Sequence, residues 1–209
     1  MVEQGNPDCS NSYRTLICVG ICLWLLLLTT VKGAAAVPPI ATPEIDLIRS
    51  DPRGGIGYRL VYYVHVPLIT YWRFKTDFQG SFLSTNEYIS EHRFVRSQDD
   101  AVITENKYTI GPDATYRWLT RVYDKQYRLE YRLLNPAECG QRFHYGSIQA
   151  RPQGEGTLVT QVAHLDFWGV SLWARFPWSG GMKDFLRSTA RWEQKTALRL
   201  ERHYESKRK

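Results

Sequence analysis

The sequence predicts an α+β domain in which one long C-terminal helix lies across a seven-stranded antiparallel sheet. The first observation is the segment Gly181 to Tyr204, where apolar residues recur at steps of three and four, the period of one helix face. The second is the stretch from Gly57 to Trp168, which consists of short strand-like runs separated by polar turns. A helix of about 22 residues is about 33 Å long, enough to cross a small sheet.

One face of the predicted helix is apolar and the rest is largely basic. The apolar positions are Met182, Phe185, Leu186, Thr189, Trp192, Thr196, Ala197 and Leu200. Lysine and arginine side chains occupy much of the remaining surface, and Gly180 and Gly181 break the chain just before it. The alternative is an exposed, basic coiled-coil tail, against which we note that no heptad repeat is sustained.

The N-terminal segment has the layout of a secretory signal peptide. Residues 16–31 are 16 uncharged positions, followed by the small-residue site Ala34 to Ala36. Sixteen residues are fewer than the roughly 20 of a membrane span. We therefore expect residues 1–36 to be removed near Ala36 and the protein to be periplasmic or secreted. Because residues 23–28 are very hydrophobic, a retained membrane anchor formed by residues 16–31 is the alternative.

Residues 37–56 are expected to form a linker, since four prolines fall between Val37 and Gly55, with room for a helical turn at Glu44 to Arg49. The folded domain is expected over residues 57–205. Beyond Cys9, Cys18 and Cys22 only Cys139 remains, so the domain has neither an internal disulfide nor a cysteine-based zinc site. No metal or cofactor is expected.

The strand-like runs of the domain follow in a simple order. Residues 57–66 form a first strand that ends at Pro67, and short helical structure follows from Leu68 to Phe78. Three hairpins come next. Their strands are expected at residues 87–96 with 101–110, 115–123 with 126–134, and 142–151 with 157–167.

The middle hairpin separates two kinds of side chain. A two-residue loop at Asp124 and Lys125 pairs Val122 with Tyr127, Thr120 with Leu129, Trp118 with Tyr131 and Tyr116 with Leu133. These aromatic and apolar residues share one face. The opposite face, called here the arginine face, carries Arg117, Arg121, Arg128 and Arg132 together with Glu130. Such a division is typical of a half-buried antiparallel sheet.

Two local motifs add a resemblance to a known superfamily. Val64-His65-Val66-Pro67 runs into Tyr71-Trp72 and Thr76-Asp77-Phe78, and Phe176-Pro177-Trp178 precedes the final helix. With the order of elements, these resemble the START-like (SRPBCC) superfamily, which includes polyketide cyclase-like proteins and has the helix-grip fold. The resemblance covers residues 57–205. It implies a curved sheet that wraps the long helix and encloses a deep, mostly apolar cavity for a lipid or other hydrophobic small molecule, with transport of that ligand as a further expectation. No catalytic residue transfers with the resemblance.

The aromatic face of the sheet and the final helix should meet at this cavity. The expected lining residues are Tyr108, Tyr116, Trp118, Tyr127, Tyr131, Phe185 and Trp192. The tryptophan-rich loop before the helix supplies the expected cavity mouth, with Trp173, Phe176 and Trp178. For each aromatic residue the alternative is simple core packing. The loop could also dip into a membrane interface, where tryptophan is favoured.

Several titratable residues could instead support catalysis or metal binding. His164 and Asp166 lie two apart on one strand and so point to the same side, where His144 or His92 could join them as a third ligand. An incidental pair is the alternative. Cys139 and His144 are five residues apart, but a thiolate nucleophile also needs an exposed, electropositive site. An enzyme of the polyketide cyclase type needs two groups to converge inside the cavity, chosen from His92, His164, Asp166, Glu91 and Tyr108.

The charge of the chain, formally +6 with a pI of about 9.2, suits anionic partners. Nucleic acid is not expected for an exported protein. The arginine face could make transient contact with an anionic membrane surface, and solvation of an ordinary outer face is the alternative. A membrane-anchored interaction module remains the third functional class.

Overall fold

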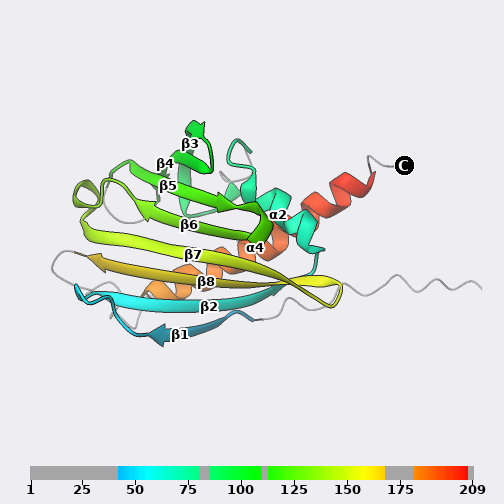
Figure 1. Cartoon of the computed structure of the whole chain (residues 1–209), viewed down its shortest axis with the longest axis horizontal. Coiled ribbons are helices and arrows are strands. Elements are labelled where there is room, and N and C mark those ends of the chain that lie inside the picture. The colour runs from blue at the N-terminus through cyan, green and yellow to red at the C-terminus, as the bar shows by residue number, and fades with distance from the viewer. Residues whose placement is uncertain (1–41, 81–84, 110–112, 168–180, 207–209) are drawn as a thin grey trace, which may run out of the picture. The chain divides into compact units, whose positions relative to one another are not determined.

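A computed structural model describes residues 42–80, 85–109, 113–167 and 181–206, all within the compact unit Pro39–Lys209. One eight-stranded antiparallel sheet runs across the domain in the order β1-β2-β8-β7-β6-β5-β4-β3, and the long helix α4 lies behind it (Figure 1). The strands are β1 (Glu44–Ile48), β2 (Ile56–Val64), β3 (Ile89–Gln98), β4 (Ala101–Tyr108), β5 (Tyr116–Tyr123), β6 (Arg128–Leu133), β7 (Gln141–Gln153) and β8 (Gly156–Phe167). The helices are α2 (Leu68–Thr76) and α4 (Gly181–Ser206), with short 3-10 turns η2 (Asp124–Gln126) and η3 (Ala137–Cys139).

The sheet has one strand more than the seven expected. Residues 44–48, expected in a linker with a helical turn, form the edge strand β1 and pair with β2 from Glu44 opposite Val61 to Ile48 opposite Gly57. Ile45 packs against the core, and Asp46 accepts a hydrogen bond from Arg59 at 2.7 Å. A five-residue edge strand depends on its partner for its structure, so local propensity alone did not indicate it.

The register of the β5–β6 hairpin differs from the expected one by two residues. The loop extends over residues 124–127, because η2 is followed by Tyr127 in the left-handed region with φ of 48°. A shift of two residues leaves every side chain on its expected face, since side chains alternate with a period of two. The observed partners on the helix side are Trp118 with Leu133, Thr120 with Tyr131, and Val122 with Leu129.

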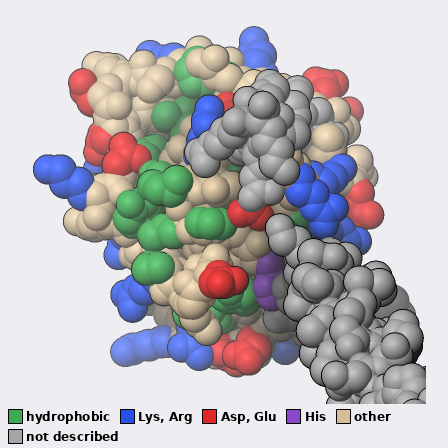
Figure 2. All heavy atoms as spheres, turned by 90° about the vertical axis from the view of Figure 1, so that its right-hand side faces the viewer, with side chains coloured by type: hydrophobic (Ala, Val, Ile, Leu, Met, Phe, Trp, Pro, Cys, Tyr) green, Lys and Arg blue, Asp and Glu red, His purple; other side chains and the backbone are tan. Residues whose placement is uncertain are grey.

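Helix α4 lies on the sheet with its predicted apolar face inward. Met182, Leu186 and Ala197 are buried in the main core, while Phe185 and Trp192 are partly buried against it. Helix α2 contributes Tyr71, Trp72 and Phe74 to the same core. The helix-on-sheet prediction is confirmed, and the coiled-coil alternative is wrong. The end of the domain shown in Figure 2 carries apolar side chains bordered by charges of both signs.

Candidate functional site

A cavity of about 650 Å³ lies between the inner face of the sheet and α4. Its wall is built from α2, strands β3 to β8 and α4, together with the segments that join them. Aromatic side chains form much of this wall. They are Phe74, Phe78, Tyr88, Tyr108, Tyr116, Trp118, Tyr131, Phe185 and Trp192. A volume of this size falls within the range of small-molecule sites.

Six of the seven expected lining residues border this cavity. These are Tyr108, Tyr116, Trp118, Tyr131, Phe185 and Trp192. Tyr127 does not border it, because its left-handed backbone in the β5–β6 loop directs the ring onto Trp72, with ring centroids 5.5 Å apart. The expected mouth residues Trp173, Phe176 and Trp178 lie outside the described residues. Whether the six residues bind a ligand stays a prediction.

Tyr131 lies flat along the cavity wall because the neighbouring strand has a glycine opposite it. Tyr131 pairs with Gly146, and a Cβ atom at that glycine would stand 2.5 Å from the tyrosine oxygen. The hydroxyl group instead donates to the main-chain oxygen of Val162 at 3.1 Å and accepts from Gln161 at 3.2 Å. Burial raises the pKa of Tyr131 to about 12, so the phenol stays neutral at physiological pH.

His144 is a neutral imidazole on the cavity wall. Its ring meets Trp118 edge to face at 4.9 Å and lies 6.2 Å from the ring of Tyr131. Burial lowers its pKa to about 4, because the surroundings disfavour the charged form. Its buried Nδ1 atom finds no hydrogen-bond partner among the described residues.

Three polar side chains of β3 and β4 form a hydrogen-bonded group on the cavity wall. The His92 Nδ1 atom lies 2.7 Å from the Asn106 side-chain oxygen, and Nε2 lies 2.9 Å from the main-chain oxygen of Phe78. The Asn106 amide in turn donates to the Tyr108 hydroxyl at 3.4 Å. His92 and Tyr108 both border the cavity. Two titratable side chains thus converge there, which is the geometric condition for an acid–base enzyme of the polyketide cyclase type.

A buried ionic cluster connects the two helices beside the cavity. Glu193 of α4 is 2% exposed and forms an ion pair with Lys75 of α2. Its carboxylate also accepts hydrogen bonds from Tyr62 at 2.5 Å and Tyr71 at 2.8 Å. Burial raises the pKa of both phenols well above the usual range, and the nearby Glu193 charge adds to it.

Sequence reasoning missed this cluster, although a signal was present. Glu193 stands four residues after Thr189 and four before Ala197, inside the apolar stripe of the helix. A carboxylate at such a position must be paired, since an isolated buried charge costs several kcal/mol. Its partner Lys75 could not be identified from spacing, because 118 residues separate the two.

The remaining titratable candidates lie outside the cavity. His164 is on the outer sheet face, stacked on Tyr145 at 5.1 Å, and Asp166 forms an ion pair with Arg142 at 3.1 Å. His144 lies on the opposite face, so it cannot join His164 and Asp166 as a ligand. Glu91 pairs with Lys107 at 3.0 Å.

Metal binding and cysteine chemistry find no support in this geometry. Within residues 42–80, 85–109, 113–167 and 181–206, no group of three or more His, Cys, Asp or Glu side chains could hold a metal ion. Cys139 is fully buried, and burial raises the pKa of its thiol to about 11, with Glu138 adding to the effect. A thiol in this environment is a poor nucleophile.

Comparisons with known proteins connect this architecture to solved structures. The Zhui aromatase/cyclase from Streptomyces sp. R1128 is similar with a TM-score of 0.58 and 11% identity, over 75% of this chain and 95% of that one. A norcoclaurine synthase point mutant from Thalictrum flavum, in complex with a transition-state analogue, gives 0.53 and 9%, over 77% and 99%. The protein TTHA0849 from Thermus thermophilus gives 0.56 and 16%, over 68% and 97%.

These similarities establish the fold and not the activity. The domain has the helix-grip fold, as the resemblance of its sequence motifs implied. No protein-family description and no curated protein matches the sequence itself. In the part of the chain that the structure describes, no helix is both long and apolar enough to cross a membrane.

Proposed function

We propose that the domain binds one hydrophobic small molecule in the cavity beneath α4. The cavity of about 650 Å³ with its aromatic wall is the observation that carries the proposal. A few polar groups at the wall, such as His144 and Tyr131, would orient the ligand, while the aromatic rings supply most of the contact area. The neighbours named as an aromatase/cyclase and a synthase support the use of this fold for small molecules.

In the fuller form of the proposal, the ligand is a lipid or another hydrophobic compound that an exported protein carries. The uncharged residues 16–31 and the small residues at Ala34 to Ala36 support export. Cell fractionation and N-terminal sequencing of the mature protein test it. A mature protein that starts at Val37 supports cleavage, whereas an intact N-terminus in the membrane fraction supports an anchor.

The direct test of binding is mass spectrometry of protein purified under native conditions. We expect a mass above that of the polypeptide in the native spectrum, and an apolar compound in the organic extract of the same sample. A filled-cavity variant, Thr189→Trp, should lose that compound, because Thr189 borders the cavity from α4. The matched control Arg191→Trp lies on the exposed side of the same helix and should retain it.

A cyclase-like enzyme is the second candidate, and the His92–Asn106–Tyr108 group favours it. These residues could transfer a proton to or from a bound carbonyl compound. Incubation with a reactive poly-β-ketone, followed by chromatography and mass spectrometry, tests for ring closure. His92→Phe and Tyr108→Phe should abolish a true activity, whereas His164→Phe on the outer face should not. Equal rates in all variants would exclude this role.

A further inference from the structure

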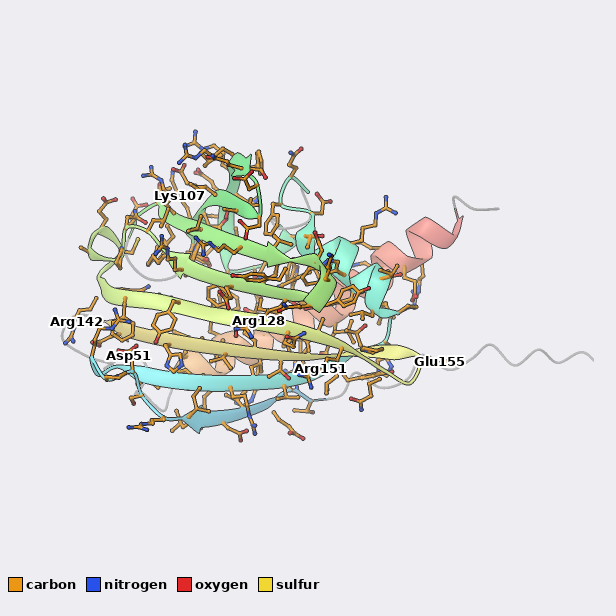
Figure 3. All side chains as sticks on the ribbon, viewed as in Figure 1. Asp51, Lys107, Arg128, Arg142, Arg151 and Glu155 are labelled. Atoms are coloured by element: carbon orange, nitrogen blue, oxygen red, sulfur yellow. The ribbon has the colours of Figure 1, made fainter. Side chains whose placement is uncertain are left out.

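A second hollow, of about 540 Å³, lies on the outer face of the sheet, away from α4. We call it the arginine groove, because Arg121, Arg128 and Arg132 line it together with Glu130, Ser147 and His164. Three of the four arginines of the arginine face thus line the groove, and Arg117 does not. Figure 3 looks onto this side of the sheet, where Arg128 is labelled near the middle.

The strand register explains how the groove forms. Arg121, Glu130 and Ser147 lie side by side on β5, β6 and β7, since Arg121 pairs with Glu130 and Glu130 with Ser147. Two residues after Glu130 on β6, Arg132 points to the same face and lies opposite Tyr145 of β7. Tyr145 in turn pairs with His164 of β8. Ser147 is small, so the long side chains around it border a hollow instead of filling it.

The groove carries an excess of positive charge. Its three guanidinium groups face one carboxylate, Glu130, which accepts hydrogen bonds from Arg128 at 2.7 Å and Tyr123 at 3.1 Å. Within the described part of the chain, Arg121 and Arg132 form no ion pair.

Three other arginines on the same face each form an ion pair with an acidic neighbour. Arg59 pairs with Asp46 at 2.7 Å, and Arg117 pairs with Glu105 at 2.9 Å. Arg142 likewise pairs with Asp166 at 3.1 Å. Positive charge on this face is therefore compensated at several positions. Among the described residues without an ion pair, Arg121 and Arg132 share one hollow, whereas Arg151 lies outside it.

Two buried polar atoms at the groove are also without partners. The Arg128 Nε and His164 Nδ1 atoms are shielded from solvent and make no hydrogen bond to any described residue. Because these two atoms are shielded from solvent, they do not face the hollow and carry no argument about its occupant. The excess of positive charge around the hollow is the observation that points to an anionic occupant.

We propose that the arginine groove binds a small soluble molecule that carries a phosphate monoester. The planar guanidinium fork matches phosphate oxygens with two parallel hydrogen bonds, and the hydroxyl group of Ser147 can supply another donor. The excess of two positive charges matches a doubly charged phosphate. The same phosphate chemistry occurs in the headgroup of phosphatidic acid, but a hollow set into a sheet suits a soluble ligand better than a flat bilayer.

Titration calorimetry on the full chain tests the proposal with glycerol 3-phosphate, inorganic phosphate and vesicles of phosphatidylcholine with phosphatidic acid. Glycerol 3-phosphate should bind, inorganic phosphate should compete with it, and added salt should weaken both. Arg121→Ala and Arg132→Ala should each weaken binding about tenfold or more. Arg151→Ala is the matched control, since Arg151 is exposed on the same side but outside the groove (Figure 3).

Binding of vesicles alone, with no binding of the soluble phosphates, would overturn the proposal. So would an equal loss of affinity in Arg151→Ala, or no binding at all. Thermal unfolding of each variant confirms that it is folded. The cavity proposal is tested separately, because a neutral apolar ligand should bind equally well to the wild type and to both groove variants.

Discussion

The hydroxyl group of Tyr131 donates a hydrogen bond to the main-chain oxygen of Val162 at 3.1 Å, reaching across Gly146 of the intervening strand β7. A side chain at position 146 would occupy the space that the phenol now fills. The tyrosine borders both the cavity and the arginine groove. The absence of a Cβ atom at position 146 therefore leaves the space in which the Tyr131 phenol lies, between the two hollows.

Gly146→Ala should destabilise the domain strongly. The new Cβ atom would lie 2.0 Å from the Val162 main-chain oxygen and 2.5 Å from the Tyr131 hydroxyl oxygen. Overpacking and the lost hydrogen bond together should lower the free energy of unfolding by about 2–4 kcal/mol. Urea denaturation measures this. Gly154→Ala, which meets no atom within 4 Å but has φ of +56°, should cost only about 1 kcal/mol; equal effects would contradict the account.

The Lys75–Glu193 pair should couple α2 to α4. Glu193→Leu removes the acceptor of two buried phenols and leaves the largely buried Lys75 ammonium group unpaired, so we expect a loss of about 3–5 kcal/mol. Lys75→Met should cost less, because Tyr62 and Tyr71 still donate to the carboxylate.

The double variant Lys75→Met with Glu193→Leu completes the cycle for this pair. Its loss should be smaller than the sum of the two single losses by about 1 kcal/mol or more, as for residues in one ionic network. Urea denaturation of the four proteins gives the comparison. Strictly additive losses would show that the pair does not couple the helices.

His144 should make the domain less stable in mild acid. Its folded pKa of about 4 lies below the ordinary 6.5, so between these values the unfolded chain binds a proton that the folded protein does not. The contribution of His144 to the free energy of unfolding should be fully present above about pH 6.5. It should fall by up to about 3 kcal/mol toward pH 4, at about 1.36 kcal/mol per pKa unit.

The variant His144→Phe isolates this contribution, because the other acidic and basic groups remain. The difference in unfolding free energy between wild type and variant should change with pH in the window from 6.5 to 4 and be flat above it. Urea denaturation at a series of pH values provides the measurement. A pH-independent difference would mean that His144 is protonated equally in both states.

Cys139 should not react in the folded protein. Its thiol is buried, and its pKa of about 11 leaves little thiolate at about pH 8. In a variant with serine at positions 9, 18 and 22, iodoacetamide should leave the native protein unmodified and alkylate it fully in urea. Rapid labelling of the native protein would show that the thiol is accessible, and would reopen the question of a reactive cysteine.

The sequence predicted those features that depend on local periodicity. The spacing of three and four residues between apolar positions predicted the long helix α4. The alternation of apolar and polar residues in β5 and β6 predicted which face of the sheet carries Tyr116, Trp118 and Tyr131. The register was wrong by two residues, but these side chains still lie on the predicted face of the sheet. Only a shift by an odd number of residues would have moved them to the opposite face.

Features that depend on distant partners were not predictable in this way. Strand β1 is defined by its pairing with β2, and the role of Glu193 by its contact with Lys75. The loop conformation of Tyr127 turned that ring away from the cavity, and nothing in the spacing of the hairpin indicated a left-handed residue there.

The measurement that tests the cavity most directly is the titration of a neutral apolar fluorophore, N-phenyl-1-naphthylamine, into wild type, Thr189→Trp and Arg191→Trp. The account predicts saturable binding, with enhanced emission, to one site on the wild type and on Arg191→Trp. It predicts a loss of at least about tenfold in affinity for Thr189→Trp, since filling the cavity displaces the probe. Equal affinity for all three proteins would contradict the claim that the ligand lies beneath α4.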